Sequence, residues 1–557
     1  MSKPASPAAD AWWRGGVIYQ IYPRSFADSN GDGIGDLPGI IEKLPYVASL
    51  GVDAIWISPF FRSPMKDFGY DIADYRDVDP MFGTLADFDR LVERAHQLGL
   101  KVVIDQVLSH TSDQHPWFKE SSASRDNPRA DWYVWADPKP DGSPPTNWLS
   151  VFGGSAWQWD ARRRQYYLHN FLASQPDLNF HCPEVQQQIL SDIRFWLDRG
   201  VDGFRFDACN FHFHDTKLRD NPPATRRDNK TVQDTNPYGM QRHLYDKTQA
   251  ENLPFLEKIR KLLDEYGAAS LGEVGDDEAL LTMAAYTSGG NKLHMAYSFN
   301  LLTAENTAAY IRAQVEELEE HMQGGWPCWS IGNHDVQRVL TRWGGPDATP
   351  AYSKMALAML LSLRGSACWY QGDELALPEA DIPFDKLQDP YGIAFWPEFK
   401  GRDGCRTPMP WAEHMPHAGF SGDADIVPWL PVPSEHAARA VDVNEADPDS
   451  MLHFTRRFLA WRRTQPALLD GSIRFLDAKE PVLALVRMLE GSGTGVLAVF
   501  NLGAQPVTVK IADAPDSTAV EGHGFGAAQT GVRDGTNFTL PAHGAYFGAV
   551  TAKPRRN

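Results

Sequence analysis

Cysteine is scarce in this sequence and long apolar runs are missing, and both shortages exclude classes of protein. A membrane-spanning helix needs roughly 18 consecutive apolar residues. No stretch comes near that length, so we expect no membrane association. The first ten residues lack the apolar core of a secretory signal. The few cysteines are scattered without the paired spacing of a metal site, which indicates reduced thiols and a cytoplasmic protein. They are Cys182, Cys209, Cys328, Cys368 and Cys405.

Positive charge is also in short supply. The chain has 53 Lys and Arg residues against 72 Asp and Glu, a formal net charge of −19. The basic runs at 162–164 and 226–227 are too short for a binding patch. An acidic surface disfavours nucleic acid and anionic membranes as partners, and it fits a neutral small molecule. The 18 Trp residues suit sugar rings, although most Trp side chains in proteins pack in cores.

Short apolar runs alternate with helical segments over most of the 557 residues, enough for two or three domains. Residues 85–98 repeat apolar side chains at a helical period. Continuous apolar strands separated by amphipathic helices are typical of parallel strands buried on both faces. Eight such strands predict a (β/α)₈ TIM barrel. They are expected at 17–22, 54–58, 101–107, 203–208, 270–274, 295–299, 329–332 and 367–371.

Three segments depart from this alternation. A long aromatic, Pro- and Gly-rich stretch follows strand three and predicts an inserted subdomain. The polar segment 210–252 predicts an extended loop over the end of strand four, and 373–429 a further insertion after strand eight. Beyond about residue 470 only strands are predicted, as in an antiparallel β domain. The expected domains are a barrel of 1–109 and 183–469, an inserted subdomain of 110–182, and a sandwich-like C-terminal domain of 470–557.

Acidic residues lie at or just after the ends of four predicted strands: Asp105, Asp207, Glu273 and Asp335. Strand ends of a barrel converge on the face where active sites lie. One such acid is easily explained as a helix cap, but four at matching ends are not, because buried acids are costly unless paired or used. Converging carboxylates without a Ser/His/Asp set indicate acid–base work on an acetal, as in glycoside cleavage.

Arg205 stands two residues before Asp207 and hence on the same face of the strand. Its charge is expected to keep Asp207 ionised, as a nucleophile requires. The alternative is a purely structural ion pair.

Ordered motifs around these acids resemble the α-amylase family, glycoside hydrolase family 13. The sequence is most similar to its α-glucosidase and oligo-1,6-glucosidase branch, over nearly the whole chain. The segment 175–179, Gln-Pro-Asp-Leu-Asn, matches the extra signature of this branch. The four motifs are Asp105-Gln-Val-Leu-Ser-His110, Gly203-Phe-Arg-Phe-Asp207, Gly-Glu273-Val and Asn333-His-Asp335.

The resemblance implies Asp207 as nucleophile, Glu273 as acid/base and Asp335 as a third acid that grips the sugar hydroxyls. It further implies an Asp71–Arg402 pair that closes the end of the pocket and makes the enzyme exo-acting, although Arg402 could simply anchor its loop; Arg406 is the other candidate. The residues implied around the non-reducing glucose are Tyr70, Asp71, His110, Arg205, His334 and Arg402.

The residue after the nucleophile is Ala208. In the similar branch a small residue there accompanies α-1,4 preference and a Val accompanies α-1,6 preference. The resemblance therefore implies maltose-like substrates, with sucrose possible. The alternatives are an oligo-1,6-glucosidase, a trehalose synthase or sucrose isomerase of the same family, and a catalytically dead binding subunit.

The loop after strand four carries Phe211-His-Phe-His214-Asp215. It resembles bacterial α-glucosidases that act on short substrates and transfer glucose to alcohols or phenols. A roof over the acceptor site would admit only small hydroxyl acceptors and shield the glucosyl intermediate from water. His212 and His214 are equally compatible with structural loop histidines.

The segment 28–36 has oxygen donors at alternate positions, like the first part of a calcium loop. Relatives hold one divalent ion there, so the resemblance implies one structural Ca²⁺ or Mg²⁺ and no organic cofactor. The alternative is a Gly/Asp turn without metal. A monomer or homodimer is expected. The implied ligands are Asp28, Asn30, Asp32, Ile34 and Asp36.

Overall fold

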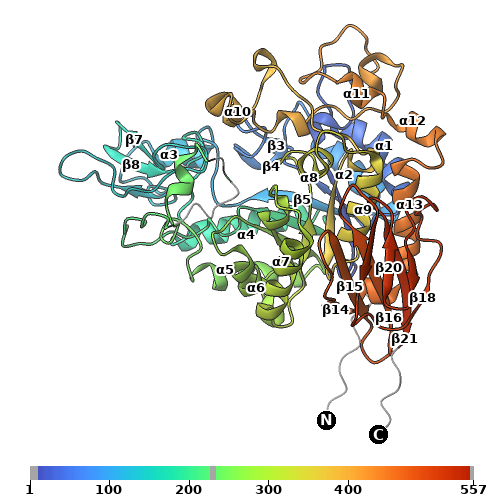
Figure 1. Cartoon of the computed structure of the whole chain (residues 1–557). Helices are drawn as coiled ribbons and strands as arrows, with labels where there is room; N and C mark the ends of the chain where they lie inside the picture. The colour runs from blue at the N-terminus through green and yellow to red at the C-terminus, as the bar shows by residue number, and fades with distance from the viewer. Residues whose placement is uncertain (1–10, 226–231, 233, 552–557) are drawn as a thin grey trace.

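Eight parallel strands form the centre of the molecule. The computed structural model describes residues 11–225, 232 and 234–551. The strand order is β11-β10-β9-β5-β2-β1-β13-β12. A parallel bridge between Ala296 and Pro327 joins the two outer strands, so the sheet is a nearly closed barrel and the predicted TIM barrel is confirmed (Figure 1). The strands are β1 (Val17–Ile21), β2 (Ala54–Ile57), β5 (Lys101–Val107), β9 (Gly203–Asp207), β10 (Ala269–Val274), β11 (Met295–Ser298), β12 (Cys328–Ser330) and β13 (Ser366–Tyr370).

Helices cover the outside of this barrel. The predicted helix at 85–98 is α2 (Leu85–Gln97), whose N-terminus is a capping box of Thr84 and Asp87. Its apolar stripe is buried against the strands, which explains why the barrel strands are apolar on both faces. The other covering helices include α1 (Leu37–Leu50), α4 (Pro183–Leu197), α5 (Asn252–Asp264), α6 (Ala279–Thr287), α7 (Ala308–His321), α8 (Val339–Gly344), α9 (Pro350–Leu360) and α13 (Met451–Arg463).

The expected insertion after strand three has its own small sheet, ordered β6-β8-β7 (Trp135–Ala136, Gln165–Leu168, Trp157–Asp160), and one short helix, α3 (Pro116–Ser121). It projects from the barrel at the left of Figure 1. The segment that connects β2 to α2 in the sequence forms a two-stranded antiparallel sheet, β3 (Phe61–Arg62) with β4 (Asp74–Val78). This sheet was not predicted.

The loop after β9 contains one short 3₁₀ turn, Pro237–Met240, in its described part. A hydrogen bond of 2.7 Å from the Thr248 N–H to the Asn210 carbonyl closes its base. The segment after β13 carries three short α-helices, α10 (Pro390–Phe395), α11 (Ser434–Ala437) and α12 (Val441–Ala446), of which only α10 lies within the predicted insertion 373–429. Both segments therefore lie, as predicted, at the carboxyl ends of barrel strands.

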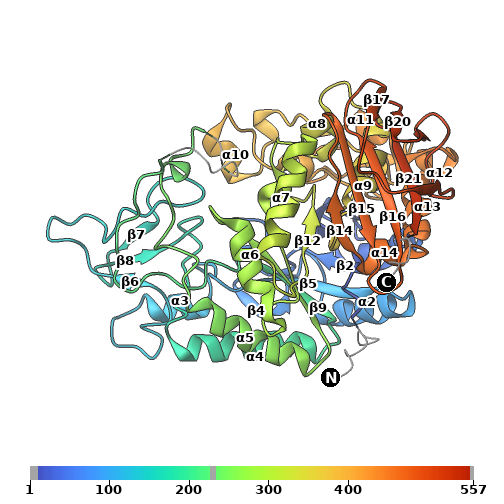
Figure 2. The same ribbon diagram turned by 60° about the horizontal axis from the view of Figure 1, so that its bottom comes forward.

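The C-terminal part is built of antiparallel strands, as expected, and follows the short helix α14 (Pro466–Asp470). Two sheets, β14-β15-β16-β21-β18 and β17-β20-β19, enclose a separate apolar core that includes Leu497 and Phe538 (Figure 2). No helix in the described part of the chain is long and apolar enough to cross a membrane. The strands are β14 (Ser472–Phe475), β15 (Val482–Met488), β16 (Thr494–Asn501), β17 (Val507–Lys510), β18 (Ser517–Ala519), β19 (Val532–Asp534), β20 (Asn537–Leu540) and β21 (Ala545–Thr551).

Candidate active site

Arg205, fully buried on β9, joins three carboxylates at the carboxyl end of the barrel. Its Nη1 lies 2.8 Å from Asp105 Oδ1 and 2.6 Å from Asp207 Oδ1. Its Nη2 lies 2.5 Å from Glu273 Oε1. The strand register explains the cluster, since Asp105 on β5 and Leu271 on β10 are the direct neighbours of Arg205. One guanidinium therefore holds the two predicted reacting carboxylates next to each other.

Asp105 has a role in this cluster that the sequence reasoning did not assign. It is fully buried and accepts hydrogen bonds from Trp56 Nε1 at 3.1 Å and from Tyr70 Oη at 3.0 Å. These bonds and the Arg205 pair use both of its oxygens. Asp105 therefore holds Arg205 in position and does not line the pocket.

The two carboxyl groups predicted to react share one electrostatic environment. Burial raises the pKa of Asp207 to about 7; Arg205 lowers it and the neighbouring Asp105 raises it. Burial likewise raises the pKa of Glu273 to about 7, again against Arg205 and with the help of Asp207. Arg205 thus favours the ionised form of Asp207, as expected. Its effect on the pKa of Asp207 is nevertheless smaller than the opposite effect of burial. The charge of Asp207 is among the causes that raise the pKa of Glu273, so ionisation of one carboxyl group disfavours ionisation of the other.

Glu273 is oriented by three donors. Its Oε1 accepts from Arg205 and from Tyr297 Oη at 3.0 Å, and its Oε2 accepts the Ala208 N–H at 3.1 Å. The last bond ties the carboxyl group to the residue that follows Asp207. Ala208 itself has φ of 42°, in the left-handed region, so the backbone bends sharply directly after the strand.

Asp335 differs from this pair because two arginine side chains and the ring of His334 lie against it. Its Oδ1 lies 2.9 Å from Arg406 Nη2 and 3.3 Å from Arg402 Nη1, and its Oδ2 lies 3.3 Å from His334 Nε2. Burial opposes ionisation, but His334, Arg402 and Arg406 outweigh it and hold the pKa of Asp335 below its ordinary value. Asp335 is therefore a permanent negative charge beside the coupled pair.

The expected pair between Asp71 and Arg402 is wrong. Arg402 Nη2 lies 2.9 Å from Asp67 Oδ1 and 2.8 Å from Asp389 Oδ1. Asp71 is fully buried and accepts the N–H groups of Lys66 and Asp67 at 2.9 and 3.0 Å, which leaves it outside the pocket lining. Asp67, not Asp71, pairs with Arg402 at the end of the pocket. The carboxylate of Asp71 is instead hydrogen-bonded to backbone N–H groups of the turn that follows β3.

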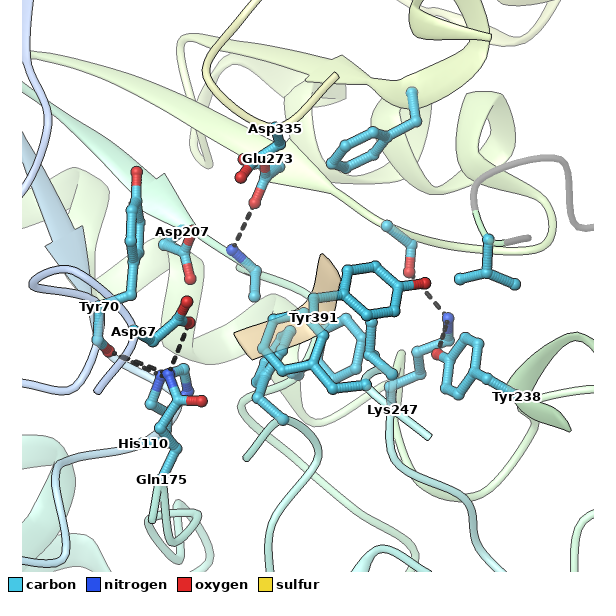
Figure 3. Close-up of a pocket in the computed structure, with 18 of the residues that line it drawn as sticks. Asp67, Tyr70, His110, Gln175, Asp207, Tyr238, Lys247, Glu273, Asp335 and Tyr391 are labelled. Atoms are coloured by element: carbon cyan, nitrogen blue, oxygen red, sulfur yellow. Dashed lines mark hydrogen bonds between the residues drawn. The ribbon is translucent and has the colours of Figure 1, made fainter. Parts of the chain in front are cut away.

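Tyr70 and His334 pack in parallel at one end of the pocket. Their ring centroids are 5.3 Å apart, and Tyr70 Oη lies 2.6 Å from His334 Nε2. His110 Nε2 bonds the Tyr70 carbonyl at 3.0 Å, and Gln175 Nε2 bonds Asp67 Oδ2 at 3.0 Å. Figure 3 shows this wall on one side of the pocket.

The pocket surface contains most of the predicted site residues, whereas Arg205, His334 and Asp71 lie behind it. The structure also brings in residues that the sequence reasoning missed. They come from the inserted subdomain, the loop after β9 and the segments after β11 and β13, and only the aromatic character of all but Lys247 gave a signal. They are Phe152, Phe171, Tyr238, Lys247, Phe299 and Tyr391, and Phe211 of the loop after β9 lines the pocket with them.

The two loop histidines lie outside the pocket lining. His212 is buried, bonds Asn252 Oδ1 through Nδ1 at 2.9 Å and stacks on Phe180. The carbonyl of His214 accepts a hydrogen bond from His181 Nε2 at 2.8 Å. Of the two interpretations, the structural one fits both.

In the predicted metal loop, the carboxylates of Asp28 and Asp36 accept hydrogen bonds from backbone N–H groups. Asp28 accepts three N–H groups of the following residues at 2.7–3.2 Å, and Asp36 caps α1 by accepting the Gly39 N–H at 2.6 Å. Among the described residues no group of three or more His, Cys, Asp or Glu side chains is placed to hold a metal ion. The Ca²⁺ or Mg²⁺ ion stays a prediction. The remaining predicted donors are Asn30, Asp32 and Ile34.

Comparison with known proteins agrees with this geometry. The family model "Alpha amylase, catalytic domain" matches residues 20–471. The chain is 54% identical to a probable alpha-glucosidase of Rhizobium meliloti over 96% of both chains. It is 36% identical to an oligo-1,6-glucosidase of Heyndrickxia coagulans over 91% of this chain and 94% of the relative. Among solved structures, the alpha-glucosyl transfer enzyme XgtA superposes with a TM-score of 0.93 at 59% identity, over 97% of this chain and 99% of that one.

Proposed function

This chain belongs to the α-amylase family of glycoside hydrolases, and from that premise we propose that it is a retaining, exo-acting α-glucosidase. Its proposed substrates are short, maltose-like α-1,4 glucosides, and its proposed second activity is transfer of glucose to small hydroxyl acceptors. The observation that carries the proposal is the Arg205 guanidinium, which holds Asp207 and Glu273 together at the bottom of the pocket. The resemblance to a named glucosyl transfer enzyme supports the transfer activity.

The chemistry follows from the coupled pair. Because both pKa values lie near 7, the pair holds about one proton at neutral pH. In the productive form Asp207 is ionised and attacks the anomeric carbon, while Glu273 donates its proton to the leaving oxygen. In the second half, Glu273 takes the proton of water or an acceptor hydroxyl, which displaces Asp207 and keeps the α configuration. The charge of Asp335 stabilises the positive charge that develops on the sugar ring.

The closed end of the pocket supports exo-action. Tyr70 and the Asp67–Arg402 pair line one end of the pocket, and we propose that they block a chain that would continue beyond a terminal glucose. The charged groups of Asp67 and Arg402 suit neighbouring sugar hydroxyls. Each hydroxyl can donate a hydrogen bond to the carboxylate and accept one from the guanidinium.

Product analysis on maltose tests the proposal. We expect glucose together with α-glucosyl transfer products, and α-glucosides of a phenolic acceptor when one is added. Trehalose as the main product from maltose, or an isomerised disaccharide from sucrose, would instead favour the synthase or isomerase alternative, which the likeness to the trehalulose synthase MutB keeps open (32% identity, TM-score 0.86).

Ala208 provides a prediction about linkage. Its side chain lines the pocket beside the nucleophile, so we expect a higher kcat/KM on maltose than on isomaltose. Ala208→Val should reduce that ratio about tenfold, the effect of one or two methyl groups in a substrate pocket. A β-branched residue at φ of 42° is strained, so the variant should also unfold at a lower temperature. Equal kcat/KM values on the two disaccharides in the unaltered enzyme would contradict the α-1,4 assignment.

A reducing compartment, and hence the cytoplasm, is proposed from the thiols. All five cysteines are free in the structure, and the Sγ atoms of Cys328 and Cys368 on neighbouring strands lie 3.7 Å apart without a bond.

A further inference from the structure

Lys247 is a buried cation on the wall of the catalytic pocket that the proposed reaction does not use. It comes from the loop after β9, is 2% exposed, and lines the same pocket as Asp207 and Glu273. Its Nζ donates to Tyr238 Oη at 2.9 Å and to the Gly275 carbonyl at 2.8 Å. Burying an ammonium is costly, so its position beside the reacting groups needs a reason.

One N–H of this ammonium is left for a ligand. A lysine ammonium has three donors, and in the part of the chain that the structure describes only Tyr238 and Gly275 accept from Lys247. Burial lowers the pKa of Lys247, but Tyr238 and nearby acids, Asp276 and Asp277 among them, raise it above its ordinary value. The group therefore stays charged without a carboxylate in direct contact among the described residues.

Lys247 lies on the side of the pocket where a leaving group or acceptor must sit. Gly275 follows the acid/base Glu273 by two residues, so its carbonyl ties Nζ to the end of β10. Figure 3 shows Lys247 and Tyr238 across the pocket from Tyr70 and Asp67, which form the glucose end. Because Glu273 protonates the leaving oxygen, the space beyond it accommodates the second sugar or the acceptor.

The surroundings of Lys247 are aromatic. Its Nζ lies 5.1 Å from the ring centroid of Phe211 and 5.4 Å from that of Tyr238. Phe152 and Tyr391, which contact each other with centroids 5.0 Å apart, also line the pocket. Aromatic walls bind an acceptor ring without regard to its hydroxyls, whereas the ammonium of Lys247 is a charged donor that can distinguish oxygen-rich acceptors.

We propose that Lys247 determines acceptor specificity by donating its third N–H to a second oxygen of the acceptor. This inference rests on the glucosyl transfer proposed above. In that step the acceptor oxygen forms a bond to the anomeric carbon, its proton passes to Glu273, and the bond to Asp207 breaks. The preferred acceptors carry a further hydroxyl or an ionised oxygen near the attacking one, as sugars, diols and hydroxy acids do.

The test uses α-glucosyl fluoride as donor, because fluoride leaves no sugar on the acceptor side. Glucose and cyclohexanol are compared as acceptors, since the two rings have the same size but cyclohexanol has no second oxygen. For Lys247→Met the ratio of glucose transfer to cyclohexanol transfer should fall about tenfold, the expected loss for one charge-assisted hydrogen bond. Fluoride release reports glucosylation separately and should fall far less than this ratio.

Tyr238→Phe is the matched control. It removes one acceptor of the Lys247 bonds but keeps the ring and the ammonium, so discrimination between the two acceptors should persist. If Lys247 merely fastens the loop, Tyr238→Phe will reproduce the loss, or Lys247→Met will reduce both transfers equally; either result overturns the inference. Should Lys247→Met fail to fold, Lys247→Gln, which retains a neutral donor, must show a partial loss of discrimination. An unaltered enzyme that releases no fluoride would refute the proposed function instead.

Discussion

Replacing Asp207 by Asn is expected to lower kcat on maltose by about 10⁴-fold or more, as removal of a nucleophile typically does. The carboxamide has nearly the same shape and still offers an oxygen to Arg205 Nη1, so the fold should be retained. It cannot form the glucosyl ester. Initial rates on maltose measure the loss, and thermal unfolding of the variant controls for the fold.

Trapping the intermediate makes the prediction about Asp207 specific. A fluorinated glucosyl fluoride that forms the ester quickly and loses it slowly should add one fluorohexosyl mass to the peptide that contains Asp207. The Asn variant should acquire no label. Substantial hydrolysis by that variant, or a label on the peptide that contains Glu273, would refute the assignment of the nucleophile.

The barrel was predictable because its strands are continuous apolar runs that are buried on both faces. β5 has the same bounds in sequence and structure, residues 101–107, and polar residues follow it closely. The strands that were missed are short or half exposed. β14, β18 and β19 each pair with the edge of a neighbouring strand. A strand of four residues or fewer is too short to show an alternation of apolar and polar residues, so the sequence does not reveal it.

The relative position of site residues was predictable only where they lie on the same strand. Arg205 and Asp207 lie two residues apart on β9, so their common direction follows from strand geometry. Asp67 and Asp71 could not be told apart in this way. They lie four residues apart in one turn, and which carboxylate is used by backbone N–H groups depends on how that turn folds.

The role of Lys247 was hidden for a related reason. The pocket wall is assembled from the segments after six different strands, β3, β9, β10, β11, β12 and β13, and from the inserted subdomain. No local pattern in the polar segment 210–252 marks a lysine that reaches the Gly275 carbonyl beyond β10. Only the packed structure places that ammonium on the acceptor side of Glu273.

The acid/base assignment leads to the second large expected effect. In the unaltered enzyme the rate should rise with pH as Asp207 loses its proton and fall as Glu273 loses its own. Because both pKa values are raised to about 7, activity should peak near pH 7 and decline on either side. Glu273→Gln should lower kcat on maltose by about 10²- to 10⁴-fold and abolish the alkaline decline.

The leaving group distinguishes an acid/base role for Glu273 from a structural one. Fluoride needs no proton, so Glu273→Gln should retain far more of its activity on α-glucosyl fluoride than on maltose. Azide needs no general base, so it should restore turnover and give α-glucosyl azide. A β-azide would mean direct displacement by a single inversion, since retention requires two inversions through the ester of Asp207. Equal losses in the rate of ester formation from maltose and from the fluoride would show that Glu273 only supports the three groups that hold it, Arg205, Tyr297 and Ala208.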